Sequence, residues 1–280
     1  MNRVKNEVYI PGHEFISINN NYNNICKSTI QIIIKKKSGT YNSSGFFIRF
    51  QKDNKRFYCI MTNDHCVSQN LINKEKEITI EYENKKKELT IKLNPKERFM
   101  KSFKNYTNFS LDITIIQIIE KDKINDEYFL LPDLDVNNYD KLVGKEITIT
   151  QFPKGGDLKI SNGEIKEINY KDNKYEFSYT ASTLKGSSGS PIVLKNKGSV
   201  IGIHKAGNDI KKENYGDFIW PIFSIINNEI DNINIVYIFQ YLDDMLALKC
   251  IACTHLISKH KKIWDGKWKC EKCKNCYLKI

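Results

Sequence analysis

Three short segments contain a histidine, an aspartate and a serine at positions where each could take part in acyl transfer. His65 follows a strand-like apolar run, Asp112 begins another such run, and Ser188 lies between glycines. A serine hydroxyl is a poor nucleophile unless a base removes its proton during attack. An imidazole can be that base near neutral pH, and a carboxylate can fix its tautomer and stabilise its cation. The order His, Asp, Ser therefore predicts His65 as general base, Asp112 as its orienting partner and Ser188 as nucleophile.

The segment Gly186-Ser187-Ser188-Gly189-Ser190-Pro191 meets a second requirement of that chemistry. Glycines let the backbone turn so that two N–H groups can point at the oxyanion formed on an attacked carbonyl. By spacing, we expect the N–H groups of Gly186 and Ser188 to form this oxyanion hole. Each segment alone has a structural alternative, because a histidine after a strand, an aspartate in a turn and a Gly-Ser loop are all common without catalysis. Their combination, in this order, favours a catalytic site.

The elements that must position these residues are short strands. Runs rich in Ile, Val, Phe, Tyr or Thr are bounded by Gly, Asn, Lys or Asp, with no long helical pattern between them. A break at Leu131-Pro132-Asp133 divides them into two sets. This pattern predicts an all-β fold, a sandwich or barrel, in two half-domains. The expected strands are 30–34, 45–50, 56–61, 78–82, 89–93, 113–119, 146–151, 158–168, 175–179, 191–194, 200–204 and 216–220.

The segments that carry the candidate residues resemble the signatures of trypsin-like serine peptidases. Thr62-Asn63-Asp64-His65-Cys66 is similar to their Thr-Ala-Ala-His-Cys, and the segment 186–191 is similar to their Gly-Asp-Ser-Gly-Gly-Pro. Leu111-Asp112-Ile113 resembles the strand start that carries their aspartate. The resemblance covers residues 25 to 225 or so. It implies a chymotrypsin-like fold of two six-stranded antiparallel β-barrels, with the active site in the cleft between them.

More specifically, the pattern resembles glutamyl endopeptidases of the staphylococcal kind. Their run Ser-Thr-x-x-Gly-x-Ser-Gly-Ser-Pro has its counterpart at 182–191, and their strand ending Val-Ile-Gly-Ile-His has its counterpart at 200–204. The resemblance implies that Thr183 and His204 line a specificity pocket, where a hydroxyl and an imidazole can hold a Glu carboxylate or a Gln amide. It also implies that the edge formed by Lys205, Ala206 and Gly207 pairs with the substrate backbone. The alternative for His204 is a core histidine satisfied by Tyr179 or by backbone.

Five cysteines lie in the last part of the chain and predict a metal site. Cys250-Ile-Ala-Cys253 and Cys270-Glu-Lys-Cys273 are two C-x₂-C pairs at the spacing of a four-thiolate zinc ribbon. Cys276 and His255 are alternative ligands, and free thiols or a redox pair are the alternative to metal. Four thiolates leave no open coordination position, so this zinc would be structural and catalysis would need no cofactor.

The same C-terminal segment is rich in lysine, and Trp264, Trp268 and Tyr277 lie among the lysines. This composition fits an acidic protein surface or nucleic acid as partner, while the alternative is that the module only caps the barrel. The regions expected are an irregular N-terminal arm (1–24), the trypsin-like peptidase domain (25–228, barrels near 25–125 and 135–228), a helical connector (229–249) and the zinc ribbon (250–280).

Composition limits the remaining classes of function. The net charge is +11, but only four of the 44 basic residues are arginine, which favours a solvated lysine surface over base-reading nucleic-acid recognition. No run approaches the roughly 20 apolar residues of a membrane helix, and Met1 to Phe15 lacks the apolar segment of a secretory signal. We therefore expect no membrane association and an intracellular location, cytoplasmic or nuclear.

Together these features predict a serine endopeptidase that hydrolyses polypeptides through an acyl-enzyme, after Glu or Gln. The alternative from another class is a catalytically silent protease-fold module that uses the cleft or the zinc ribbon to bind protein or nucleic acid.

Overall fold

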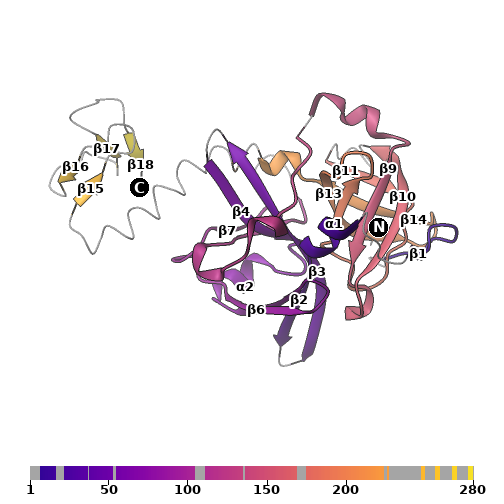
Figure 1. The fold of residues 1–280 in the computed structure, drawn as a ribbon, viewed down its shortest axis with the longest axis horizontal. Coiled ribbons are helices and arrows are strands. Elements are labelled where there is room, and N and C mark those ends of the chain that lie inside the picture. Colours follow the sequence, from indigo (N-terminus) through magenta and orange to yellow (C-terminus); the bar gives the residue numbers. More distant parts are fainter. Residues whose placement is uncertain are drawn as a thin grey trace. The chain divides into compact units, whose positions relative to one another are not determined.

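Antiparallel strands are the main regular elements of the computed structural model (Figure 1). The structure describes residues 7–16, 22–36, 38–52, 55–104, 111–134, 136–168, 175–223 and 226, and four short strands between 247 and 279. The chain divides into two compact units, Met1–Ile226 and Asn227–Ile280. The first unit contains both large sheets and all three residues predicted to be catalytic.

The first sheet of this unit is open. Its strands run in the order β6-β5-β2-β3-β4-β8-β7, all antiparallel, and among the described residues β6 and β7 do not pair with each other. Both edges are lysine-bearing, which discourages further pairing. The strands are β2 (Thr29–Lys36), β3 (Gly39–Lys52), β4 (Lys55–Thr62), β5 (Glu77–Tyr82), β6 (Lys87–Lys92), β7 (Met100–Ser102) and β8 (Thr114–Gln117).

The second sheet closes into a barrel. β9 pairs with both β10 and β12, so six strands form a ring in the order β9-β10-β11-β14-β13-β12, and β1 adds to the outside of β10. The all-β, chymotrypsin-like class predicted from the sequence is confirmed, although only this second barrel is closed. The strands are β1 (Phe15–Ile16), β9 (Glu146–Gln151), β10 (Lys159–Ile168), β11 (Glu176–Tyr179), β12 (Pro191–Leu194), β13 (Val200–Asn208) and β14 (Glu213–Phe218).

Alternation of apolar and polar residues explains the two cores. Ile30, Ile32 and Ile34 on β2 are buried on one face and pack with Ile78 and Ile80 of β5. The second barrel is filled by a separate cluster that includes Ile149, Phe177 and Phe218. Burying such side chains contributes about 1.5–3 kcal/mol each, so each sheet has its own driving force to fold.

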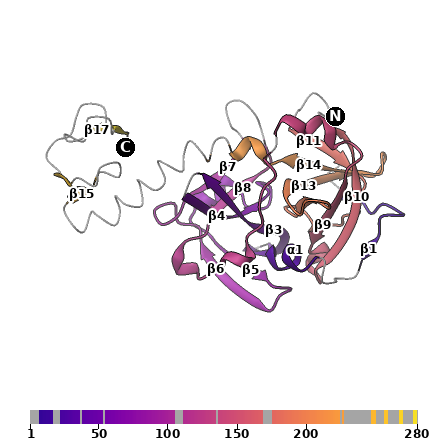
Figure 2. The same cartoon turned by 45° about the horizontal axis from the view of Figure 1, so that its top comes forward.

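Helices are short and connect the strands. Figure 2 shows α1 beside strands of both sheets, and its Cys26 packs against Phe152, Leu158 and Ile160 of the second barrel. The labelled α-helices are α1 (Asn23–Ser28) and α2 (Gln69–Asn73), residues 220–223 are also helical, and the labelled 3₁₀ turns are η2 (Glu120–Asp122), η3 (Asp126–Tyr128), η4 (Val136–Leu142) and η5 (Pro153–Gly155). None of the helices in the described part of the chain is long and apolar enough to span a bilayer.

The segment between the two sheets fastens one to the other. Leu130 forms a parallel bridge with Ile48 of β3, and Pro132 forms one with Val200 of β13. The hydroxyls of Thr29 and Thr150 add a buried hydrogen bond of 2.5 Å between β2 and β9. The predicted break in the sequence at 131–133 is therefore a strap that pairs with both halves.

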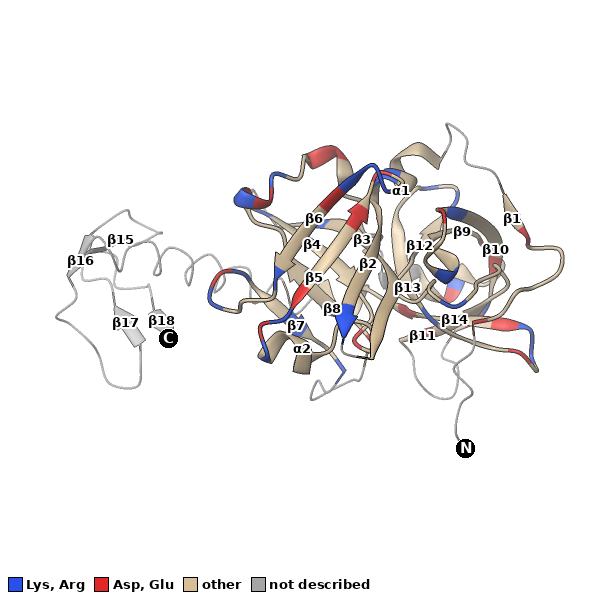
Figure 3. Cartoon of the chain, turned by 90° about the horizontal axis from the view of Figure 1, so that it is seen from below, with Lys and Arg blue, Asp and Glu red and all other residues tan. Residues whose placement is uncertain are grey.

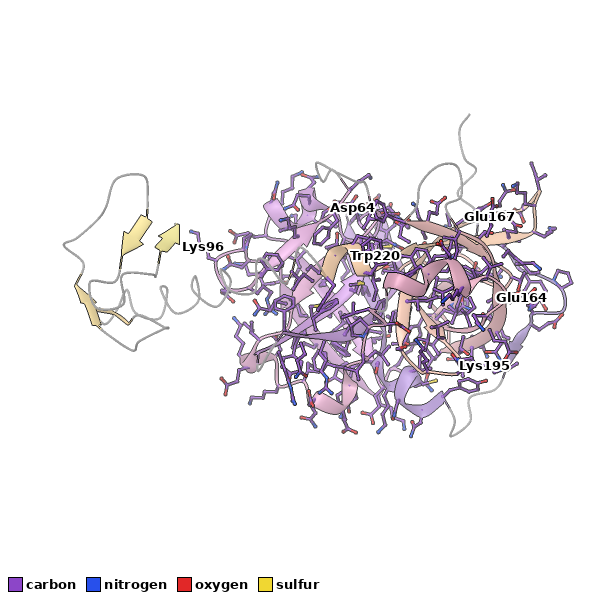
Figure 4. All side chains as sticks on the ribbon, turned by 90° about the horizontal axis from the view of Figure 1, so that it is seen from above. Asp64, Lys96, Glu164, Glu167, Lys195 and Trp220 are labelled. Carbon is purple, nitrogen blue, oxygen red and sulfur yellow. The ribbon has the colours of Figure 1, made fainter. Side chains whose placement is uncertain are left out.

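Surface charge in the first unit is mixed. Figure 3 shows acidic and basic segments next to one another over both sheets, and Figure 4 shows Glu164, Glu167 and Lys195 toward the outside of the second barrel. Ion pairs such as Lys195–Glu146 and Lys166–Glu164 join neighbouring charges. This distribution agrees with the interpretation of the lysine excess as solvated surface.

The second unit contains two small antiparallel hairpins. β15 (Ala247–Lys249) pairs with β16 (Leu256–Ser258), and β17 (Lys267–Lys269) pairs with β18 (Tyr277–Lys279). The predicted ligands Cys250, Cys253, Cys270 and Cys273, the alternatives Cys276 and His255, and most of the predicted helix at 229–249 lie outside the described residues.

Candidate active site

The structure brings His65 and Asp112 into direct contact. His65 lies in the turn after β4, and Asp112 lies just before β8, which pairs with β4. The imidazole Nδ1 is 2.5 Å from Oδ2 of Asp112, and the backbone N–H of His65 donates to Oδ1 of the same carboxylate at 2.9 Å. With Nδ1 held in this way, the other ring nitrogen, Nε2, is left to accept a proton from a substrate or nucleophile.

The pKa values of this pair follow from their contact. Burial would raise the pKa of Asp112, but the hydrogen bond and charge of His65 outweigh burial and lower it. Burial would lower the pKa of His65, but its hydrogen bond to Asp112 and its contact with Cys66 raise it above the ordinary value. The pair therefore favours imidazolium beside carboxylate, the state that a general base reaches after taking a proton.

Asp64 is a second carboxylate close to His65 in the sequence, and the structure assigns it a different role. Asp64, labelled in Figure 4, accepts a hydrogen bond from the Ser102 hydroxyl at 2.6 Å and forms an ion pair with Lys104 at 3.1 Å. It also accepts from the backbone N–H of Gln69 at the start of α2. Asp64 thus fixes the loop after His65, and Asp112 alone orients the ring.

Ser188 lies in a tight loop between β11 and β12 that only glycine permits at two positions. Gly186 and Gly189 have φ values of +98° and +91°. A Cβ at Gly189 would lie 2.1 Å from the carbonyl oxygen of Ser44, and one at Gly186 would lie 2.9 Å from that of Phe152. Any other residue would combine a left-handed backbone with a steric clash.

Ser44 of β3 holds this loop against the first sheet, a role that the sequence did not indicate. Its N–H donates to the carbonyl of Ser188 at 2.9 Å, and its hydroxyl donates to the carbonyl of Gly186 at 2.9 Å. The same hydroxyl accepts the N–H of Phe152 at 3.0 Å. Two adjacent serines in a strand give no local signal for such contacts, which join residues 142 and 108 positions apart.

The N–H groups predicted to form the oxyanion hole both lie near the carboxylate of Glu7. The carbonyl of Lys185 accepts a hydrogen bond from the N–H of Lys154. Because C=O and N–H point in opposite directions in a trans peptide, this bond turns the N–H of Gly186 away from Lys154. The N–H of Ser188 donates to Oε1 of Glu7 at 3.2 Å, and the N–H of Gly186 lies close enough to the same carboxylate to lower its pKa.

Glu7, from the N-terminal arm, occupies the site in this conformation. The Ser188 hydroxyl donates to Oε1 of Glu7 at 2.8 Å, and no hydrogen bond joins it to His65 among the described residues. Burial raises the pKa of Glu7, although the bonds from Ser188 and the charge of His65 act in the opposite direction. A substrate carbonyl can take the same two N–H groups only after Glu7 has left them.

The residues after Glu7 hold the arm in the barrel. Val8 exchanges backbone hydrogen bonds with the side chain of Asn214 and accepts one from the N–H of Thr183. Ile10 exchanges two with the hydroxyl of Ser182, at 2.7 and 2.9 Å. The arm at 1–24 was predicted to be irregular, and its contact with the site was missed because an extended polar segment carries no periodic signal.

The predicted pocket residues Thr183 and His204 are both fully buried on adjoining parts of the barrel. The Thr183 hydroxyl donates to Oδ1 of Asn214 at 2.8 Å, and Asn214 pairs with Gly207 across β13 and β14. His204 on β13 lies 2.5 Å through Nδ1 from the hydroxyl of Tyr179, while its Nε2 makes no hydrogen bond within the described residues. Asn214 was not predicted, because it takes part through contacts across the barrel.

His204 is neutral in the folded protein. Burial, helped by the charge of His65, lowers the pKa of His204 to about 3, and a backbone contact with Tyr215 opposes this only in part. Burial also raises the pKa of Tyr179, so its phenol keeps a proton that it can donate to Nδ1. In that arrangement Nε2 carries the ring hydrogen and is a neutral donor.

Lys205 and Gly207 have different environments from one another. The Lys205 ammonium donates to Glu176 and Asp217, each at 2.8 Å, so its charge is already paired within the barrel and is not directed at a substrate side chain. Gly207 lies on the part of β13 beyond its pairing with β12, which ends at Ile203. That free edge is compatible with the predicted backbone pairing of a substrate.

Solved structures share this fold. The chain matches a Glu endopeptidase in complex with MPD at 18% identity and a TM-score of 0.53, covering 80% of this chain and 99% of that one. It matches an inactivated protease paralogue of the scabies mite at 17% and 0.53, covering 79% and 99%. It also matches a serine endoprotease from Yersinia pestis at 13% and 0.53, covering 77% and 67%.

Identities this low show the fold alone, and one of the three neighbours is an inactivated protease. No curated protein matches the chain by sequence. Residues 43–203, in contrast, match the family model of the trypsin-like peptidase domain, and this span is more than half of the chain. It includes His65 and Asp112, which bond each other, and Ser188, whose hydroxyl bonds Glu7. The chain therefore belongs to the family of trypsin-like peptidase domains.

Proposed function

We propose that the protein is a serine endopeptidase that cleaves polypeptides through an acyl-enzyme, after Gln in preference to Glu. One observation carries the proposal of turnover. The hydroxyl and the N–H of Ser188 both bond a single carboxylate, that of Glu7, whose pKa the nearby N–H of Gly186 also lowers. Donors that converge on one anion are arranged to stabilise the oxyanion of a tetrahedral intermediate, and losing one such donor typically costs about 10²–10³ in rate.

The mechanism follows from the geometry. After Glu7 leaves, Oγ of Ser188 attacks the scissile carbonyl carbon while Nε2 of His65 takes its proton. The carbonyl oxygen becomes an oxyanion between the N–H groups of Gly186 and Ser188. Asp112 holds Nδ1 and stabilises the imidazolium. His65 then returns the proton to the leaving amine, and water hydrolyses the Ser188 ester with His65 again acting as base.

The charges of the predicted pocket residues favour Gln over Glu as the residue before the cut. With His204 neutral and Lys205 paired to two carboxylates, neither of these predicted pocket residues offers a free cation to a Glu side chain. Burying an uncompensated carboxylate is costly, whereas a Gln carbonyl can accept from Nε2 of His204 at no charge cost. A neutral amide therefore fits better than a carboxylate.

Matched peptides that differ only in Gln, Glu or Leu before the cut test this specificity. We expect the ratio of kcat/KM for Gln over Glu to exceed one at pH 7 and to fall as the Glu peptide protonates near pH 4–5. His204→Ala should reduce cleavage of the Gln peptide far more than that of the Leu peptide. Preference for Glu at pH 8, unaffected by His204→Ala, would exclude this pocket and leave the nucleophile assignment intact.

A catalytically silent binding module is the second candidate, and two observations favour it. Glu7 covers the predicted oxyanion hole. In addition, the inactivated protease paralogue of the scabies mite matches this chain with the same TM-score, 0.53, as the Glu endopeptidase. A fluorophosphonate probe separates the two functions, because it labels only an activated serine. We expect labelling of Ser188 in the wild type and in Glu7→Ala, and none in Ser188→Ala. Absence of labelling in Glu7→Ala would favour the silent module.

We also propose a structural zinc in the second unit. In the sequence, Cys250 and Cys253 lie between β15 and β16, and Cys270 and Cys273 lie between β17 and β18. A C-x₂-C pair in the connection of each of two hairpins suits a tetrahedral thiolate site, which would stabilise the fold and leave catalysis to the first unit. One zinc per chain should copurify with reduced protein and be lost in Cys250→Ser or Cys273→Ser but kept in Cys26→Ala. A zinc-free preparation would exclude the site.

A further inference from the structure

Three charged side chains of the second barrel, Asp217, Lys205 and Glu176, form a cluster that contacts the backbone of Asp112. Asp217 of β14 accepts the backbone N–H of Asp112 through Oδ2 at 2.9 Å and the Lys205 ammonium through Oδ1 at 2.8 Å. Lys205 also donates to Glu176 of β11 at 2.8 Å. Asp217 and Glu176 are fully buried, and the Lys205 side chain is nearly so.

This cluster lowers the folding stability of the barrel compared with apolar residues at the same positions. Asp217 and Glu176 are direct cross-strand partners, and like charges in such pairs destabilise a sheet. A buried ion pair gains little stability over apolar residues of the same size, because its charges lose their hydration. The barrel even carries an irregularity in β13 between His204 and Ala206, which turns Lys205 toward the two acids. Stability alone does not account for the arrangement.

The two polar backbone groups of Asp112 are hydrogen-bonded by different parts of the molecule, the N–H by this cluster and the C=O by a residue just after the end of β4. Asp217 takes its N–H, and the Asn63 side chain donates to its C=O at 2.7 Å. With both polar backbone groups fixed, the Asp112 Cβ has a set starting position, and the backbone N–H and Nδ1 of His65 bond the two carboxylate oxygens. A displacement of about 1 Å in such a group can cost about a hundredfold in rate.

We propose that Asp217, braced by Lys205 and Glu176, is a positioning residue that sets the backbone of Asp112 and so the orientation of the His65 imidazole. The inference rests on the proposed function in that it concerns the same His65–Asp112 pair. Asp217 touches no reacting atom. It connects the closed barrel to the acid of the open sheet, so that the base and the nucleophile loop share one rigid frame.

The test compares Asp217→Asn, which keeps an oxygen acceptor for the Asp112 N–H, with Asp217→Ala, which removes it. NMR titration of His65 needs no turnover, so it remains interpretable even if the protein hydrolyses nothing. The charged or titratable groups that act on His65 and its acid are Asp112, Cys66, Glu7, His204 and Lys205. Asp217→Asn removes one negative charge and leaves that of Lys205 less balanced. We expect the titration of His65 to move to lower pH by about half a unit.

In activity assays, Asp217→Ala should lower kcat about tenfold to a hundredfold with KM nearly unchanged, and Asp217→Asn should recover most of the loss. Asp122→Ala is the matched control. The side chain of Asp122 is also buried, accepts the backbone N–H of Ile119 and pairs with Arg98, but it lies in the η2 turn and has no hydrogen bond to Asp112 or His65 in the described residues. It should lose thermal stability without a change in kcat at temperatures where it is folded.

Both variants lose the charge of Asp217, but only Asp217→Ala loses the acceptor for the Asp112 N–H, so the His65 titration should differ between Asp217→Ala and Asp217→Asn. Two outcomes would overturn the proposal. One is the same His65 titration in both variants. The other is a loss of kcat in Asp217→Ala no greater than in Asp122→Ala at equal thermal stability. If Asp217→Ala does not fold, Asp217→Leu, which keeps the bulk but has no acceptor, takes its place. If no variant and no wild type shows hydrolysis while the titrations differ as expected, the proposed function fails and the positioning role stands.

Discussion

The two sheets contribute to the site in different ways. The open first sheet supplies His65 and Asp112, held mainly through side-chain contacts at the ends of β4 and β8. The closed second barrel supplies Ser188, whose environment is built from backbone: two left-handed glycines, and carbonyls and N–H groups fixed by Ser44 and Lys154. An imidazole can be oriented by one carboxylate, whereas an oxyanion hole requires peptide groups held in a fixed direction. The closed barrel therefore carries the residue proposed as nucleophile.

Removing the nucleophile should have the largest effect on this division of roles. Ser188→Ala should reduce hydrolysis by about 10⁵–10⁶ while the melting temperature stays nearly unchanged, because in the described part of the chain the hydroxyl bonds only Glu7. Ser190→Ala is the control, since Oγ of Ser190 is buried without a hydrogen-bond partner in the described residues. Retained turnover in Ser188→Ala would remove this serine from the mechanism.

Changing the carboxylate of the first sheet should reduce kcat less than removing the nucleophile does. Asp112→Asn keeps the size of the side chain but allows the wrong imidazole tautomer, and we expect kcat to fall by about 10⁴. Asp64→Asn, which alters the contacts with Ser102 and Lys104, should cost less than tenfold. Similar losses in both variants would show that the acid was assigned wrongly.

The backbone dependence of the second barrel is tested at a glycine. Gly189→Ala places a Cβ 2.1 Å from the Ser44 carbonyl, so the loop must move, and we expect about a 10²–10³-fold loss of kcat together with lower thermal stability. Gly198→Ala also has a positive φ, +69°, but meets nothing within 4 Å. It should lose little stability and no activity. Equal behaviour of the two variants would contradict the role of the Ser44 contact.

The smallest predicted effect is an increase in kcat/KM. Glu7→Ala should raise kcat/KM at pH 7 by about tenfold, because the two hydrogen bonds that hold Glu7 on Ser188 are lost. Glu14→Ala, in the same arm but bonded only to Gly12, should change nothing.

The docked Glu7 has a raised pKa, so docking takes up a proton and is strongest at low pH. As the pH rises through that pKa, docking weakens and the wild type approaches the variant. A ratio of variant to wild-type activity that increases with pH would contradict this.

Local sequence was sufficient for much of the fold. The strands expected at 146–151 and 191–194 have the observed bounds of β9 and β12, because alternation and turn residues mark both ends. β1 and β7 were missed because runs of two and three residues carry no period. His65, Asp112 and Ser188 could be proposed from motifs whose chemistry is local, and the structure brings them together.

The contacts that the sequence did not indicate are those made at long range. Glu7 and Ser188 are 181 positions apart, and Asp112 and Asp217 are 105 apart. Asn214 joins Val8 to Thr183 across the barrel. Whether the first sheet closes also depends on which strand edges meet, and neither edge strand shows this in its own residues.

The order of the chain gives the contact between Glu7 and Ser188 a consequence for biosynthesis. The ribosome makes Glu7 long before Ser188, and the hydroxyl and N–H groups that bind its carboxylate come from the later part of the first unit. The covering segment is therefore already present when the last wall of the site folds around it. A newly made chain therefore completes the Ser188 site with a side chain of its own in place, so that the proposed hydrolysis can begin only after Glu7 leaves.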